Sequence, residues 1–151
     1  MTINDIIPKS YVDARNLWQG LHTTAHFWDD LIDKDNKNED VHNVLWFLLV
    51  ELPTNKFYIT NFNVIQPAIT HACMTFVASA KLEKNKERLD ISHVLRYELG
   101  AVLLHIALII HGKKFVMDYG DEIYKLIVDN TFEDYLKEQE NKSWFLNFGK
   151  I

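Results

Sequence analysis

The sequence predicts an all-α fold in a single domain. Its 151 residues have the size of one domain. The apolar share of 48% and the charged share of 25% are typical of a globular protein and exclude disorder as the main state. Only five Gly and three Pro are present, which disfavours an all-β fold with many tight turns. Apolar residues recur at intervals of three and four, which indicates a bundle of about six helices spanning residues 1–151.

The first two helices are expected on either side of a polar turn. Residues 11–33 form the first helix, because apolar side chains recur there at helical spacing. A polar stretch over 34–38 has the composition of a turn. The second helix covers 39–52, and Pro53 is expected just past its end, since proline cannot continue a helix.

The middle of the chain is expected to hold one short irregular segment and one long helix. Residues 54–63 predict a loop or a short helical turn. A third helix runs from 64 to 84, and Pro67 fits its first turn, where a missing N–H is tolerated. The charged residues 84–88 form the next connection.

Three further helices are expected in the second half. An unbroken helix covers 90–111, and Gly112 is suited to its C-terminal end. The next covers 114–128. Thr131 is expected to cap a short last helix that ends between 137 and 140.

Charge and composition bound the possible functions. A net charge of −5 disfavours direct nucleic-acid binding, which needs clustered cations. Cys73 is the single cysteine, so it cannot form an internal disulfide and is expected to pack as a small apolar residue. No signal-peptide pattern opens the chain, and the longest apolar run, 99–110, is shorter than the ~20 residues that span a bilayer. We therefore expect a cytoplasmic protein without a membrane segment. Five aromatic residues are expected in the core: Trp18, Trp46, Phe47, Phe57 and Phe76.

The first helix carries a stripe of acidic and histidine residues. At ~100° per residue, His22, His26, Asp29 and Asp33 fall within about 60° of arc, and Asp30 lies at the edge. Carboxylates at close quarters repel each other unless a cation lies between them. Mg²⁺ or Mn²⁺ suits the oxygen ligands best, and the imidazoles would also admit Zn²⁺ or Fe²⁺. The alternative is a solvated helix end, although acids near a helix C-terminus oppose the macrodipole.

A second candidate set lies on the helix expected over 90–111. Glu98 and His105 share one face of it, whereas Arg96 points about 160° away from Glu98. A buried glutamate needs a partner, so Glu98, or else His105, would complete the metal shell if this helix packs against the first. The alternative for His105 is an ordinary core histidine. With Asp30, both His105 and Arg96 are candidates for contacts to a bound ligand.

The segment Asp29-Asp30-Leu31-Ile32-Asp33 has the form DDxxD and resembles the aspartate-rich motif of class I isoprenoid (terpenoid) synthases. This resemblance implies a reduced version of that all-α fold, with Mg²⁺ held by Asp29 and Asp33 against a substrate diphosphate. The segments 28–33, 52–58 and 96–99 also resemble small helical proteins of phages and prophages, a likeness that implies no activity.

Three functions follow from these observations. The first is a metal-dependent protein that binds a phosphorylated or diphosphate ligand at the Asp/His stripe. The second is a non-enzymatic inhibitor or accessory protein of phage type, whose acidic helical surface engages the basic nucleic-acid channel of a partner protein. The third is a self-associating subunit that uses Trp144 and Phe145 in the apolar tail. No motif for nucleophilic catalysis or for a phosphate-binding glycine loop occurs in the sequence.

Overall fold

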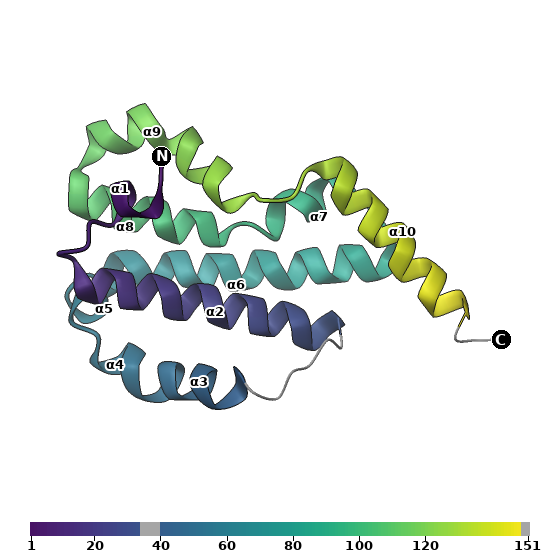
Figure 1. The fold of residues 1–151 in the computed structure, drawn as a ribbon, viewed down its shortest axis with the longest axis horizontal. Helices are drawn as coiled ribbons and strands as arrows, with labels where there is room; N and C mark the ends of the chain where they lie inside the picture. The colour runs from purple at the N-terminus through teal and green to yellow at the C-terminus, as the bar shows by residue number, and fades with distance from the viewer. Residues whose placement is uncertain (34–39, 149–151) are drawn as a thin grey trace.

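The computed structural model describes the backbone of residues 1–33 and 40–148 and the side chains up to residue 142. Within these residues every regular element is helical, which confirms the all-α class (Figure 1). The elements are, in chain order, α1 (Ile3–Ile6), α2 (Val12–Asp33), α3 (Val41–Trp46), the π-helical segment η2 (Phe47–Glu51), α4 (Leu52–Thr54), α5 (Lys56–Thr60), α6 (Phe62–Asn85), α7 (Leu89–Leu95), α8 (Leu99–His111), α9 (Lys113–Ile127) and α10 (Phe132–Phe148).

The long helices α2 and α6 run along the longest axis of the molecule (Figure 1). The arm formed by α3, η2 and α4 lies along one side of α2. On the opposite side of the molecule, α8 packs against α6 and α9 packs against α8. Helix α10 contacts α7 and then extends away from the other helices, toward the C-terminus at the right of Figure 1.

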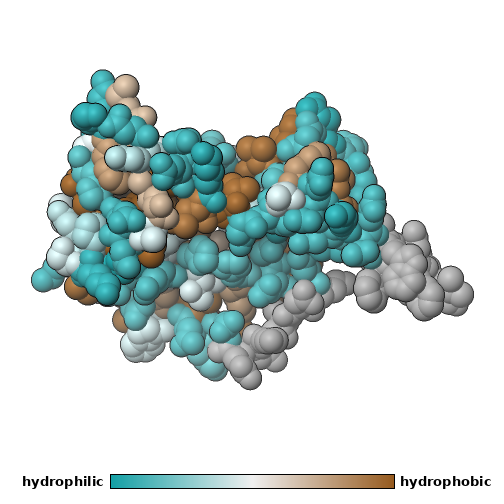
Figure 2. Space-filling model, turned by 45° about the horizontal axis from the view of Figure 1, so that its top comes forward, coloured by the Kyte–Doolittle hydropathy of each residue, from teal (hydrophilic) through white to brown (hydrophobic). Residues whose placement is uncertain are grey.

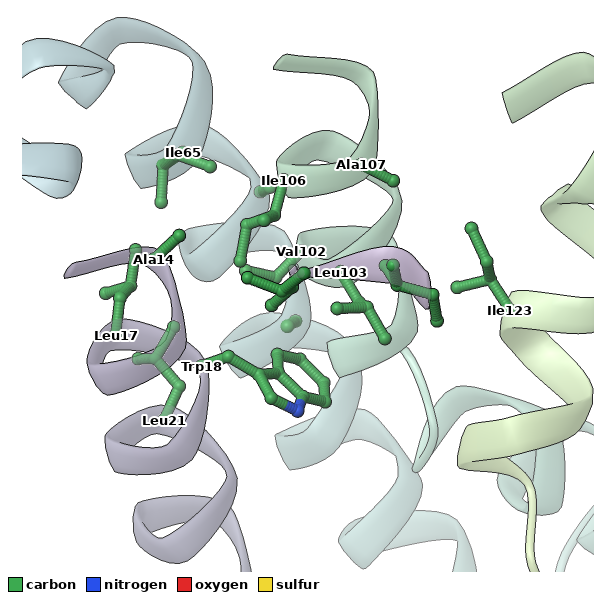
Figure 3. Packing of buried hydrophobic residues seen from close by; sticks show 14 of the residues in the cluster. Ala14, Leu17, Trp18, Leu21, Ile65, Val102, Leu103, Ile106, Ala107 and Ile123 are labelled. Carbon is green, nitrogen blue, oxygen red and sulfur yellow. The ribbon is translucent and has the colours of Figure 1, made fainter. Parts of the chain in front are cut away.

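The hydrophobic core lies between α2, α6 and α8 (Figure 3). Its α2 residues follow the spacing i, i+3, i+4 and i+7, so one stripe of that helix is buried. Burying one such side chain fully stabilises the fold by about 1.5–3 kcal/mol. The core residues of these two helices are Ala14, Leu17, Trp18 and Leu21 on α2, and Val102, Leu103, Ile106 and Ala107 on α8.

The second predicted helix is longer than expected, because Pro53 lies inside it. Pro53 occupies the first turn of α4, directly after the π-helical segment. It has no N–H to donate, and the hydrogen-bond ladder shifts just before it, where the Leu52 N–H donates to the Phe47 carbonyl. The prediction that Pro53 ends the helix is therefore wrong. The polar turn predicted over 34–38 lies outside the described residues.

The helix predicted over 90–111 is broken. Arg96, Tyr97 and Glu98 form a turn between α7 and α8, in which the Tyr97 N–H donates to the Val94 carbonyl at 3.2 Å. The Glu98 N–H likewise reaches only three residues back, to Leu95, at 3.3 Å. This tightening redirects the chain at Arg96, whose side-chain partners lie on α2 and α6.

The remaining boundaries are mostly close to prediction. Gly112 ends α8 with a positive φ of 87°, and Thr131 accepts a hydrogen bond from the Asp134 N–H at 3.2 Å, so both predicted caps are confirmed. The segment 54–63, predicted as a loop or a short helical turn, contains the short helix α5, capped by Asn55. Helix α10 continues to Phe148, well past the predicted end.

One apolar stretch, Leu89–His111, is long enough and apolar enough to cross a membrane when judged by length and composition alone. It comprises α7, the turn and α8 in this structure. A core helix of a globular protein passes the same test. Helix α8 is such a helix, since Val102, Leu103, Ile106 and Ala107 on it are buried in the core.

Gly20 provides the place where the arm packs on α2. A Cβ atom at this position would lie 2.1 Å from Cε2 of the Phe47 ring. Only glycine therefore lets the buried Phe47 ring lie against α2 at this distance.

We expect Gly20→Ala to lower the free energy of unfolding by about 1–3 kcal/mol, because the added methyl group displaces the Phe47 ring. Gly120→Ala on α9 is the matched control, since its nearest atom, Leu104 Cδ2, is 3.7 Å away. There the higher helix propensity of alanine is expected to stabilise the protein by up to about 1 kcal/mol. Urea denaturation of both variants measures the difference, and a stabilising Gly20→Ala would contradict the packing described here.

Candidate functional site

The side chain of Arg96 joins three helices at the centre of the candidate site. It is 15% exposed and begins at the turn between α7 and α8. Its Nη2 atom donates to Asp29 Oδ2 on α2 at 3.3 Å, and Nη1 lies 3.7 Å from Glu83 Oε1 on α6. The guanidinium carbon lies 5.4 Å from the ring centre of Tyr135 on α10 and 5.6 Å from that of Tyr97. Asp29 and Arg96 are both candidate site residues from the sequence, and in the structure they form an ion pair with each other.

The charged forms of Asp29 and Arg96 are not equally stabilised in this pair. Burial raises the pKa of Asp29 above its usual value, and this effect outweighs the opposing attraction of Arg96. For Arg96, burial lowers the pKa, but Asp29 and Glu83 raise it by more, so the guanidinium stays charged. Its Nη1 atom is buried and has no hydrogen-bond partner among the described residues. Arg96 therefore retains an unused donor in a partly dehydrated place.

An apolar cavity of about 420 Å³ adjoins Arg96. Its walls come from α2, from the arm α3–η2–α4 and from α6, and the rings of Trp28 and Phe76 meet there with centres 4.8 Å apart. Among the described residues that line it, Arg96 is the only charged one. The apolar wall includes Leu21, Trp28, Leu45, Leu48, Ile69 and Phe76.

A polar groove of about 590 Å³ lies on another side of Arg96 and Asp29. Asp33 also lines it and forms an ion pair with Lys142 on α10, at 3.0 Å. Asp129 and Glu138 add two further carboxylates. Arg96 thus stands between an apolar cavity and an acidic groove.

The histidines of the predicted stripe lie beside this groove. The rings of His22 and His26 meet edge to face with centres 4.5 Å apart, and both line a small pocket with Asp29. Partial burial, together with the neighbouring His26, lowers the pKa of His22. Asp30 is exposed on the other side of the helix end. Within residues 1–33 and 40–142, no group of three or more His, Cys, Asp or Glu side chains is close enough to hold a metal ion.

Glu98 and His105 have partners away from the stripe on α2. The Glu98 carboxylate lies 3.7 Å from His71 on α6 and accepts a hydrogen bond from the Tyr124 hydroxyl on α9 at 3.5 Å. The His105 Nδ1–H donates to the Ala101 carbonyl one turn earlier, at 2.6 Å. The expected metal shell completed by Glu98 or His105 is therefore not formed, because the turn at 96–98 replaces the continuous helix on which their common face depended.

Several residues of the site were not expected from the sequence. Cys73 is exposed and lines the apolar cavity, so its predicted packing in the core is wrong. Trp46, also expected in the core, is 61% exposed. Glu83 follows Phe76 by seven residues on the same face of α6, and this spacing was a usable signal. Tyr135 carried no such signal, because its position depends on how α10 docks.

Comparisons with known proteins identify no relative of this chain. The chain matches no protein-family model, and neither curated proteins nor solved structures give a match. The function is therefore argued from the geometry alone.

We expect Arg96→Met to lower the free energy of unfolding by about 3–5 kcal/mol, since it leaves the carboxylates of Asp29 and Glu83 without their cation. Arg88→Met is the matched control, because Arg88 forms an exposed ion pair with Asp90. Its loss is expected to destabilise the protein far less, because solvent screens an exposed pair. Chemical denaturation gives both values, and equal effects would contradict the central role of Arg96.

The raised pKa of Asp29 predicts a pH-dependent variant. The folded state holds the Asp29 proton more tightly than the unfolded state does. Its stabilising contribution is therefore full below the unfolded pKa and is lost as pH rises through the folded pKa. We expect Asp29→Asn, which is always neutral, to raise the melting temperature at about pH 7 and to lose this advantage toward about pH 4.

Asp30→Asn serves as the control for this measurement, because it removes an exposed acid from the same helix end. Melting curves across the pH range are compared for both variants and the parent protein. A pH-independent gain, or an equal gain in Asp30→Asn, would show that burial of Asp29 does not govern the effect.

Proposed function

We propose that this protein binds a small amphipathic anion, with the apolar part in the cavity and the acidic head group on Arg96. The observation that carries the proposal is the position of Arg96. It is the one charged residue on the wall of an apolar cavity, and its buried Nη1 lacks a hydrogen-bond partner among the described residues.

The cavity has the properties that such a ligand requires. Its volume of about 420 Å³ lies within the range of roughly 300–1,000 Å³ that is typical of small-molecule sites. Apolar walls favour an alkyl chain or ring system by about 25 cal/mol for each Å² removed from water. A carboxylate or phosphate suits the planar fork of a guanidinium, which can donate to two oxygens at once.

Asp29 occupies the place that the ligand's head group would take. Because burial raises the pKa of Asp29, its charged form is poorly stabilised in spite of Arg96. An incoming acid therefore replaces a weak partner rather than a strong one. The same reasoning makes protonation of Asp29, or its replacement by Asn, favourable for binding.

The metal predicted from the DDxxD segment has a defined role in this proposal. Asp29 and Asp33 are each paired with a cation, Arg96 and Lys142, so a divalent ion alone must displace both. A phosphorylated ligand would draw Arg96 away from Asp29 and free its carboxylate. We therefore propose that Mg²⁺ or Mn²⁺ binds together with a phosphorylated ligand, not before it.

Protection of Cys73 tests the cavity, because this single cysteine is exposed at its wall. Burial raises the pKa of its thiol, so modification by a thiol reagent is followed at about pH 8. Dodecanoate and dodecyl phosphate, each at ten times its dissociation constant, are expected to slow the reaction about tenfold. Dodecanol and dodecyltrimethylammonium are the neutral and cationic controls with the same chain.

Two outcomes of this experiment would count against the proposal. Absence of protection by either acid would exclude the cavity as their site. Equal protection by dodecanol would exclude a contribution from Arg96. In Asp29→Asn the acids are expected to bind more tightly, and the comparison of carboxylate with phosphate identifies the preferred head group.

Thermal unfolding tests the metal. Mg²⁺, Mn²⁺ and Zn²⁺ alone are expected to leave the melting temperature unchanged, whereas Mg²⁺ or Mn²⁺ with dodecyl phosphate is expected to exceed the shift from dodecyl phosphate alone. A ligand at ~100 times its dissociation constant adds ~2.7 kcal/mol. Asp33→Asn is expected to remove the metal-dependent part only. A shift with metal alone, or no added shift with both, would contradict this order of binding.

A further inference from the structure

A second groove, of about 540 Å³, lies between α2 and the arm α3–η2–α4. It uses a different face of α2 from the apolar cavity and shares only Val44 with it. The arm follows α2 closely here (Figure 1), and the Asn55 side chain ties the end of the arm to the Asp13 carbonyl at 2.8 Å. The groove is thus a separate feature, and a hydrogen bond between the arm and α2 lies among its lining residues.

Three exposed side-chain amides line this groove, those of Asn16 and Gln19 on α2 and of Asn43 on α3. Their side chains form no hydrogen bond with any other described residue, so they can bond to a bound molecule. Each amide offers both a donor and an acceptor, which is the pattern that a peptide group presents. Side chains on both walls can therefore bond to an extended backbone lying between them.

The charges of the groove have one sign. Asp13 and Glu51 line it, and neither forms an ion pair within the described part of the chain. Within the part of the chain that the structure describes, no Lys, Arg or His lines the groove. The exposed indole of Trp46 lies on the same wall as Glu51, and tryptophan is the aromatic ring that binds cations best.

We propose that this groove is the docking site for an extended basic segment of a partner protein. The amides bond to the backbone of the segment, Asp13 and Glu51 attract its Lys or Arg side chains, and their aliphatic stems lie on Trp46. The stripe from Asp13 to Thr23 on α2 is about 15 Å long at 1.5 Å per residue, which matches roughly four or five extended residues. Nucleic acid and acidic peptides are disfavoured by the same two carboxylates.

An NMR titration tests this site with the full-length protein. The probe is the blocked pentapeptide acetyl-Ala-Arg-Ala-Lys-Ala-amide, and the readouts are the side-chain amide signals of Asn16, Gln19 and Asn43 and the indole N–H of Trp46. These signals are expected to shift together on one binding curve. The matching peptide with Glu in place of Arg and Lys is expected to leave them unchanged.

Variants distinguish binding in the groove from non-specific attraction of a basic peptide to the acidic protein surface. Asp13→Asn, Glu51→Gln and Trp46→Ala are each expected to weaken binding about two- to fivefold. All three residues are exposed, so the unperturbed part of the spectrum reports whether each variant keeps its fold. Glu133→Gln removes an exposed acid from α10 and is expected to leave the affinity unchanged.

The proposal fails if the acidic peptide produces the same shifts, if the basic peptide perturbs acidic surfaces throughout the protein, or if Glu133→Gln weakens binding as much as Glu51→Gln. It also fails if the basic peptide leaves the four signals unmoved. None of these outcomes bears on the apolar cavity, because the two sites have different walls.

Discussion

A guanidinium group that is 15% exposed must exchange most of its hydration for partners inside the protein, and Arg96 finds them on three helices. Asp29 on α2 and Glu83 on α6 supply negative charge, and the ring of Tyr135 brings in α10. This requirement accounts for the turn between α7 and α8, because the side chain must approach α2 and α6 at this point. Removal of Arg96 would leave the carboxylates of Asp29 and Glu83 without their cation, which costs more than the ion pairs themselves contribute.

The polar network beside Arg96 holds α10 in place. The Tyr135 hydroxyl donates to Glu83 at 2.9 Å and bonds to Ser92 Oγ at 2.8 Å. Ser92 and Ser79 exchange hydrogen bonds with each other's carbonyls, at 3.0 and 2.9 Å. Burial raises the pKa of Tyr135, so its phenol remains a donor at neutral pH. The part of α10 whose side chains are described therefore docks with the help of hydrogen-bonded groups, which require defined geometry.

The sequence predicted what depends on local spacing. The buried stripe of α2 is visible in the sequence as a 3.6-residue period. Gly112 ends α8 and Thr131 caps α10, as their residue types predict. The turn at 96–98 was not predictable, because no proline or glycine lies in it and its cause is an ion pair with residues distant in the chain. The candidate site shows the same division. Asp29 was identified by its stripe, whereas its partnership with Arg96, not Glu98, depends on how helices pack.

The arm α3–η2–α4 connects the two proposed binding sites. Its inner residues Val44 and Phe47 are buried against α2, while its other faces form walls of the apolar cavity and of the second groove, which lies between α2 and the arm. Figure 2 shows a face tilted by 45° from the view of Figure 1, where hydrophobic residues reach the surface in a hollow between two raised parts. The close contact between Gly20 and Phe47 sets the position of the arm, and both volumes depend on that position. A change in the position of the arm would therefore alter both volumes at once.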